Sequence, residues 1–145
     1  MKQEMKLEID SIPSNESFAR VVVAAFLTRL NPTMEEVADI KTAISEAVTN
    51  AIIHGYKQEV HKILIEAVVE KDTLEVSVQD FGVGIADIEK AMEPLYTTRR
   101  DLERSGMGFV FMEAFMDTIK VISKPGEGTK VTMTKKIGRR YEMQE

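Results

Sequence analysis

The sequence QDFGVGI, residues 79–85, places glycines at the second and fourth positions after Asp80. Three interpretations compete for this stretch: the metal-binding Asp-Phe-Gly of a eukaryotic-type protein kinase, a plain turn, and the floor of a nucleotide pocket on another fold. The kinase interpretation also requires a Gly-rich loop, a strand lysine and an H-R-D catalytic loop, and the sequence lacks these signatures. A turn and a nucleotide pocket remain.

The chain has 145 residues, no cysteine, 43% hydrophobic residues and a formal net charge of −5. This length and composition predict one soluble domain over residues 1–145, with a polar tail from about 138 to 145. The acidic balance disfavours direct nucleic-acid binding, and no apolar stretch indicates a signal peptide or a membrane anchor. The lack of cysteine is compatible with the reducing cytoplasm, where we expect the protein.

Hydrophobic periodicity predicts three helices and five strands. The helices are expected over residues 14–30, 33–54 and 106–116, and the strands over 5–10, 62–69, 73–79, 118–123 and 129–135. Their order predicts an α/β fold, a two-layer sandwich of a mixed, mostly antiparallel sheet with helices on one face.

Local signals define the ends of the two long helices. Ser14 is the expected N-cap of the first helix, and Thr33 with Glu36 forms an expected capping box at the start of the second. Gly55 is expected to end the second helix as a C′ residue. The apolar stripe expected on the first helix comprises Phe18, Val21, Val22, Ala25 and Phe26.

The second predicted helix carries Glu46, Asn50 and His54 at positions i, i+4 and i+8. On an α-helix these side chains follow one another along one side, at the border of the apolar arc. A carboxylate, an amide and an imidazole are costly to bury there unless they have partners. We therefore interpret the stripe as functional, with a solvated polar face as the alternative.

Two glycine-rich stretches suggest contacts to a nucleotide. Gly82 and Gly84 would let the backbone approach a flat ring while Asp80 accepts a hydrogen bond from an exocyclic amine, although a simple glycine turn is the alternative. The stretch 104–108, RSGMG, opens the third predicted helix, and a helix N-terminus offers free N–H groups to phosphates. Residues 82–105 between them are polar and are expected to form a functional lid.

Four motifs in order resemble the ATP-binding family of gyrase, Hsp90, histidine kinases and MutL, whose Bergerat-type fold matches the predicted sandwich. They are E-x-x-x-N-x-x-x-H at 46–54, D-x-G-x-G at 80–84, G-x-G at 106–108 and G-x-G-T at 126–129. The resemblance implies that Glu46 is the general base, Asn50 binds Mg²⁺ and Asp80 pairs with the adenine amine. The other implied nucleotide-binding positions are His54, Gly82, Gly84, Arg104, Ser105, Gly106, Met107, Gly108 and Thr129.

Within that family the chain resembles the anti-sigma factor serine kinases of Gram-positive bacteria. The stretches that carry this resemblance are NESFARVVVAAF, NPTMEEVADIKTAISEA, SEAVTNAIIHGY and PLYTTRRDLERSGMGF. It implies a protein that holds a sporulation sigma factor of the sigma-F type and uses ATP with Mg²⁺ to phosphorylate a serine of an anti-anti-sigma factor. It also implies a homodimer.

Two alternatives stay open on the sequence. The first is a nucleotide-gated, sigma-binding module without kinase activity, and the second is an isolated histidine-kinase catalytic domain. Glu46 argues against the first, because a domain that only binds has no need of a carboxylate beside the metal. The second would need a separate phosphoacceptor, since the only histidines are His54 and His61 and neither lies in an expected dimerising hairpin.

Overall fold

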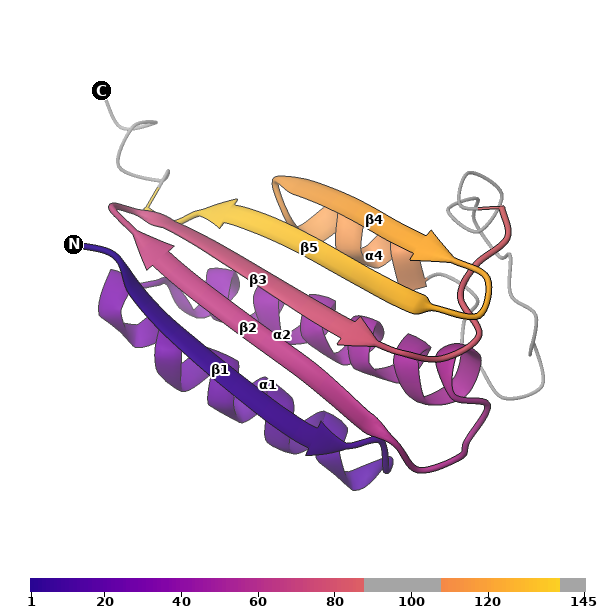
Figure 1. Ribbon diagram of the computed structural model, residues 1–145. Coiled ribbons are helices and arrows are strands. Elements are labelled where there is room, and N and C mark those ends of the chain that lie inside the picture. Colours follow the sequence, from indigo (N-terminus) through magenta and orange to yellow (C-terminus); the bar gives the residue numbers. More distant parts are fainter. Residues whose placement is uncertain (88–107, 139–145) are drawn as a thin grey trace.

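The computed structural model describes residues 1–87 and 108–138. One sheet with the strand order β1-β2-β3-β5-β4 forms the front layer in Figure 1. Its strands are β1 (Gln3–Asp10), β2 (Lys62–Glu70), β3 (Thr73–Asp80), β4 (Thr118–Lys124) and β5 (Gly128–Lys136). The predicted strands are therefore confirmed to within two residues at each end. Every pairing within the described ranges is antiparallel, so this sheet contains no parallel component.

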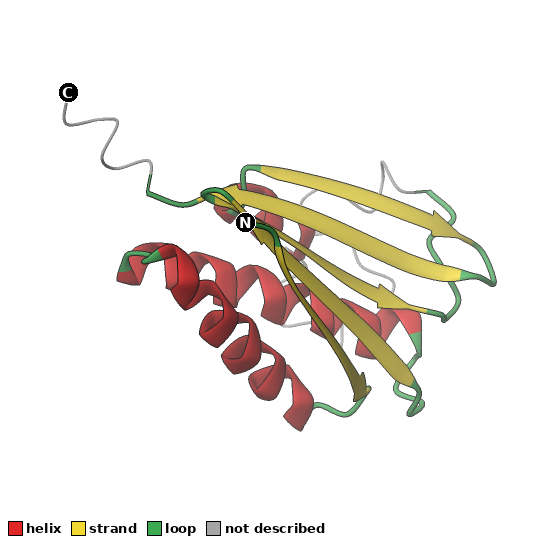
Figure 2. Cartoon of the chain, turned by 60° about the vertical axis from the view of Figure 1, so that its left-hand side comes forward, coloured by secondary structure: helices red, strands yellow, loops and turns green. Residues whose placement is uncertain are grey.

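All helices of the described chain lie on one face of the sheet, which confirms the predicted two-layer sandwich (Figure 2). They are α1 (Ser14–Leu27) with the 3₁₀ turn η1 (Thr28–Leu30), α2 (Met34–Asn50) with the π-helical turn η2 (Ala51–Gly55), and α4 (Gly108–Phe115). In these residues no helix is both long and apolar enough to cross a membrane. Parts of three predictions lie outside the described residues. They are residues 88–105 of the expected lid, 106–107 of the third predicted helix and 139–145 of the expected tail.

The predicted capping box at the start of α2 is confirmed. The Thr33 hydroxyl accepts a 3.0 Å hydrogen bond from the Glu36 N–H, and Glu36 Oε1 accepts one of 2.9 Å from the Thr33 N–H. The second oxygen of Glu36 accepts a 2.9 Å bond from the N–H of Gly138. One side chain therefore fixes the start of α2 and also ties it to the chain that follows β5.

Two predictions for α1 are wrong. Pro13, and not Ser14, is the N-cap residue, and its φ of −54° already suits the helix that begins at Ser14. The expected stripe is correct at Phe26, which is buried, but is otherwise out of phase, because Phe18 and Val21 are 51% and 59% exposed. The residues of α1 that face the core are Ala19, Val23, Phe26 and Leu27. Apolar residues occupy most of the circumference of α1 after Phe18, so periodicity alone could not select the buried side.

The prediction that Gly55 is a C′ residue is also wrong. Instead α2 continues into a π-helical turn in which the N–H of Tyr56 donates to the carbonyl of Ala51 over 2.9 Å. The left-handed backbone conformation expected of a C′ residue occurs later, at Lys57 (φ 51°) and Gln58 (φ 69°). A left-handed backbone conformation therefore does not explain the glycine at position 55.

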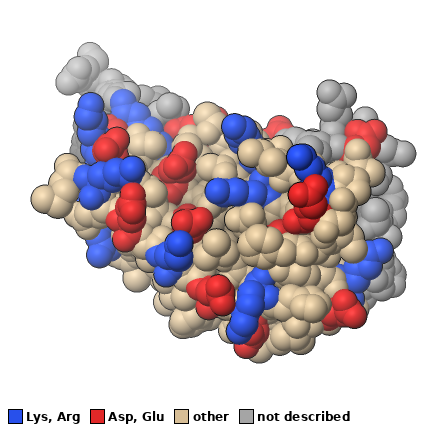
Figure 3. Space-filling model, viewed as in Figure 1, with Lys and Arg blue, Asp and Glu red and all other residues tan. Residues whose placement is uncertain are grey.

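The core lies between the helices and the inner face of the sheet. Fully buried side chains there include Val23, Leu27, Ile40, Ile44, Val48, Ile63, Ile65, Leu74, Val76, Met112 and Met133. Alternate residues of β1 to β5 face the opposite side, where Lys and Arg side chains are interspersed with Asp and Glu (Figure 3). This visible face carries no continuous basic stripe of the kind that duplex-binding surfaces show.

Candidate nucleotide-binding site

Asp80, the last residue of β3, is buried, with 5% of its surface exposed. Its Oδ1 accepts a 2.9 Å hydrogen bond from the N–H of Gly82. Burial raises the pKa of the Asp80 carboxyl above its ordinary value, and the backbone N–H groups of Gly82 and Thr129 lower it in part. A carboxylate offers about four acceptor positions, so these two donors leave capacity for a further donor such as an exocyclic amine.

Gly55 lies directly against this carboxyl group. An ideal Cβ on Gly55 would lie 2.6 Å from Cγ, 2.7 Å from Oδ2 and 2.8 Å from Oδ1 of Asp80. The carbonyl of Gly55 also accepts a 2.9 Å hydrogen bond from the N–H of Val83. The end of η2 thus contacts the Asp80 side chain and is joined to the segment after β3 by a backbone hydrogen bond.

The glycines after Asp80 allow backbone segments to approach closely. A Cβ on Gly82 would lie 1.9 Å from the carbonyl oxygen of Gly55, and one on Gly84, whose φ is +76°, would lie 2.1 Å from the carbonyl oxygen of Lys124. Gly128 has a φ of +100° and passes equally close to the backbone of Asp80 and Phe81. These glycines therefore allow the end of β3, the end of β4 and the start of β5 to pack closely near Asp80. Their predicted contact with a flat ring stays a prediction.

Thr129 of β5 pairs with Asp80 of β3 in the sheet and donates its N–H to the Asp80 carboxyl. Its hydroxyl lies 2.8 Å from that of Ser123, which in turn accepts a 2.7 Å hydrogen bond from the N–H of Ile85. Thr129 therefore supports Asp80 through its backbone, and its side chain belongs to a polar link that anchors the segment after β3.

The hydroxyl of Tyr56 also holds the segment that follows β3 in place. It accepts a 2.8 Å hydrogen bond from the N–H of Phe81 and donates to the carbonyl of Lys62. Burial raises the pKa of Tyr56, as does the nearby charge of Asp80 to a smaller extent. This buried ring therefore connects the start of β2 to the residue that follows Asp80.

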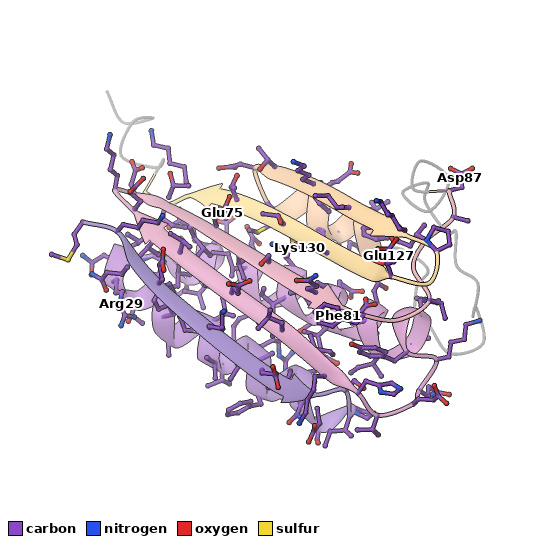
Figure 4. All side chains as sticks on the ribbon, viewed as in Figure 1. Arg29, Glu75, Phe81, Asp87, Glu127 and Lys130 are labelled. Atoms are coloured by element: carbon purple, nitrogen blue, oxygen red, sulfur yellow. The ribbon has the colours of Figure 1, made fainter. Side chains whose placement is uncertain are left out.

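A cleft of about 520 Å³ opens next to Gly55 and Gly82, the neighbours of Asp80, although Asp80 itself does not line it. Its lining residues are Gly55, Tyr56, Lys57, Glu59, His61, Lys62, Phe81, Gly82, Val83 and Gly126. Two segments meet at this end of the sheet: the one after β3, which begins with Phe81, and the turn between β4 and β5, which contains Glu127 (Figure 4). The N–H of Gly126 donates to the carbonyl of Val83 over 2.7 Å and joins these segments.

Glu46 and Asn50 lie on α2 and His54 lies on η2, all three half-buried at the border of the core, as the sequence predicts. Glu46 and His54 each interact with another group. Gly108 lies within the third predicted helix and is the first described residue of α4. Arg104, Ser105, Gly106 and Met107 lie outside the described residues, so their predicted phosphate contacts stay predictions.

The residues present fit a magnesium ion that is held mainly by a nucleotide. Within the described ranges no group of three His, Cys, Asp or Glu side chains could hold a metal on its own. Mg²⁺ commonly takes only one or two protein oxygens and completes its shell with phosphates and water. The carboxamide oxygen of Asn50, half-buried on α2, is a suitable hard ligand of this kind.

Sequence reasoning identified Asp80 and its glycines but missed Gly55, Tyr56 and Ser123. Gly55 was assigned to a helix end because a glycine at that place usually is one. Tyr56 and Ser123 act on the site through backbone groups of Phe81 and Ile85, which are more than 20 residues away along the chain. Local sequence patterns do not predict contacts between residues so far apart along the chain.

Comparison with known proteins gives a consistent result. The model of the histidine kinase-like ATPase domain family matches residues 11–135. An anti-sigma F factor of Oceanobacillus iheyensis is 56% identical over 140 residues, which cover 96% of each chain. One from Clostridium acetobutylicum is 57% identical over 136 residues, which cover 94% of this chain and 95% of that relative.

A solved structure supports the fold independently. The crystal structure of the RsbU and RsbW domains of a Mycobacterium tuberculosis protein superposes with a TM-score of 0.66 at 23% identity. The match covers 93% of this chain but only 32% of that longer one, so it supports the fold alone.

Proposed function

Because the chain belongs to the histidine kinase-like ATPase domain family, and within it to the anti-sigma F factors, we propose that it binds ATP and holds a sigma factor of the sigma-F type. We further propose that it transfers the γ-phosphate of ATP to a serine of an anti-anti-sigma factor. The match to relatives over nearly their whole length supports a single functional unit over residues 1–145. A cytoplasmic location and a homodimer belong to the same proposal.

The observation that carries the ATP assignment is the environment of Asp80. A carboxylate at 5% exposure, with two backbone N–H donors and capacity for a further donor, is arranged to accept a hydrogen bond from a buried amine. The 6-amino group of adenine is such a donor.

The phosphates would lie toward Asn50 on α2 and toward the start of α4. Mg²⁺, when bound through Asn50, would neutralise phosphate charge and hold the γ-phosphate in line. The half-buried Glu46, one helical turn before Asn50, would accept the proton of the incoming serine hydroxyl. The serine oxygen would then bond to the γ-phosphorus as the bond to the bridging oxygen breaks and ADP leaves. Positioning and charge supply most of the catalysis in such reactions.

The test combines labelled phosphate and acid treatment. Purified protein is incubated with γ-labelled Mg²⁺-ATP, a sigma factor of the sigma-F type and a candidate anti-anti-sigma factor. The proposal predicts an acid-stable phosphoserine on the anti-anti-sigma factor and binding of the sigma factor to this chain. ATP binding without transfer would favour a nucleotide-gated binding module, and an acid-labile product on a separate partner would favour a histidine-kinase catalytic domain.

A further inference from the structure

We propose that Gly55 sets the position of the Asp80 carboxylate and thereby makes the pocket select a 6-amino purine over a 6-oxo purine. Gly55 is a positioning residue in this account, since it acts on the nucleobase through Asp80. The inference rests on the proposed function, because it assumes that Asp80 meets the base of a nucleotide.

The contact between the two residues leaves no room for a side chain at position 55. A Cβ there would come within 2.6 to 2.8 Å of all three atoms of the Asp80 carboxyl group, a separation that real Cβ atoms essentially never show. The φ of Gly55 is not positive, so an alanine would not be strained by the backbone conformation. The requirement for glycine at this position is therefore steric, and the group that a side chain would collide with is the carboxyl of Asp80.

Gly55 itself cannot move aside easily. Its carbonyl accepts the 2.9 Å hydrogen bond from Val83 N–H, and the π-helical turn of which it is part is closed by the bond from Tyr56 to Ala51. π-Helical turns of this kind are frequent at functional sites. An added methyl group would therefore displace the Asp80 carboxyl, which can rotate about the Cα–Cβ bond while the backbone stays in place.

The displaced carboxyl would lose its present partners. Its 2.9 Å hydrogen bond from Gly82 N–H and its bond from Thr129 N–H both depend on its current position. An amine of a bound base would likewise meet a misplaced acceptor. A hydrogen bond to a charged acceptor is worth about 10-fold to 100-fold in affinity, and this factor would be lost.

Inosine triphosphate is the appropriate probe, because it differs from ATP at the base alone, where it carries an oxygen in place of the 6-amino group and a hydrogen on N1. Dissociation constants of Mg²⁺-ATP and Mg²⁺-ITP are measured by calorimetry for the full chain and for Gly55→Ala. The wild-type chain should bind ATP about 10-fold to 100-fold more tightly than ITP. In Gly55→Ala this ratio should fall to within about 3-fold of unity, because ATP loses more affinity than ITP.

The control is Thr33→Ala, which removes the capping box at the far end of α2 and destabilises the fold without touching the pocket. Its ATP-to-ITP ratio should equal that of the wild type. An unchanged ratio in Gly55→Ala would overturn the inference and leave the proposed function intact. A wild-type chain that binds both nucleotides equally would overturn the inference alone, and a wild-type chain that binds neither would overturn both the inference and the proposed function.

A second pair of variants covers the case in which Gly55→Ala does not fold. If the carboxyl is the group with which the new methyl collides, truncating it should relieve the collision. The inference therefore predicts that Gly55→Ala folds in an Asp80→Ala background, and that its effect on the urea midpoint is smaller there. If Asp80→Ala alone folds and the double variant does not, the inference is contradicted, since the obstacle would then be another group.

Discussion

The backbone N–H of Gly82 donates a 2.9 Å hydrogen bond to Oδ1 of Asp80, two residues earlier at the end of β3. The bond closes a tight turn around a buried acidic group and fixes that group at the point where β3, β5 and the end of α2 meet. Burial raises the pKa of Asp80 against the opposing effect of this donor. The raised pKa has a consequence that can be measured without any ligand.

Stability of the ligand-free protein should depend on pH through Asp80. The pKa of this carboxyl is higher in the folded state than its ordinary value of 3.8, so the folded state binds the proton more tightly. Its contribution to the free energy of unfolding is present below pH 3.8 and is lost as pH rises through the raised folded pKa. Urea unfolding between about pH 4 and pH 8 should show wild type losing stability relative to Asp80→Asn over that window.

The matched control is Ser77→Ala, a buried and non-titrating position on the same strand. It should offset the stability curve without altering its dependence on pH. Parallel curves for wild type and Asp80→Asn would show that Asp80 titrates alike in both states and would contradict the burial argument.

Asn50→Ala should remove the dependence of ATP affinity on magnesium. The side chain is half-buried at the border of the core, so we expect the fold to survive its truncation. Calorimetric titrations with Mg²⁺ and with a chelator should differ strongly in the wild type and agree in Asn50→Ala. Thr49→Ala, on the neighbouring position of the same helix, is the control. A wild-type response to Mg²⁺ in Asn50→Ala would refute the assignment of Asn50 as metal ligand.

Tyr56→Phe should destabilise the protein by about 1 to 3 kcal/mol, because it leaves the N–H of Phe81 and the carbonyl of Lys62 without their common partner. Phenylalanine keeps the buried ring, so the cost comes from the hydroxyl alone. Chemical denaturation at neutral pH measures the difference. No loss of stability would mean that water replaces the hydroxyl at both groups.

The sequence predicted the strands well because their signals are local. Apolar and polar residues alternate over 62–69 and over 73–79, and the connection between these stretches is short. This pattern predicts an antiparallel hairpin, which the structure contains. The capping box at Thr33 and Glu36 is equally local and is equally confirmed. The phase of α1 was not predictable in this way, because apolar residues surround most of that helix and only packing against the sheet selects Val23 over Val21.

The sequence was enough to propose candidate site residues, but it did not predict which residues support Asp80 in the fold. Asp80 and the glycines after it form a motif that can be recognised from spacing. The contact of Gly55 with Asp80 depends on a π-helical turn that inserts the glycine beside a strand 25 residues further on. The local pattern is that of a glycine at a helix end and does not predict which group the glycine accommodates, because tertiary packing makes that choice.

The most direct test of the account is the rate of γ-phosphate transfer by Glu46→Gln in a single turnover with bound Mg²⁺-ATP and the anti-anti-sigma factor. Glutamine keeps the shape of the side chain but cannot accept the serine proton. We predict that transfer slows by about 10²-fold to 10⁴-fold while ATP binds as in the wild type, and that the exposed Glu35→Gln on the same helix transfers normally. Transfer at the wild-type rate by Glu46→Gln would contradict the assignment of Glu46 as the general base and with it the proposed mechanism.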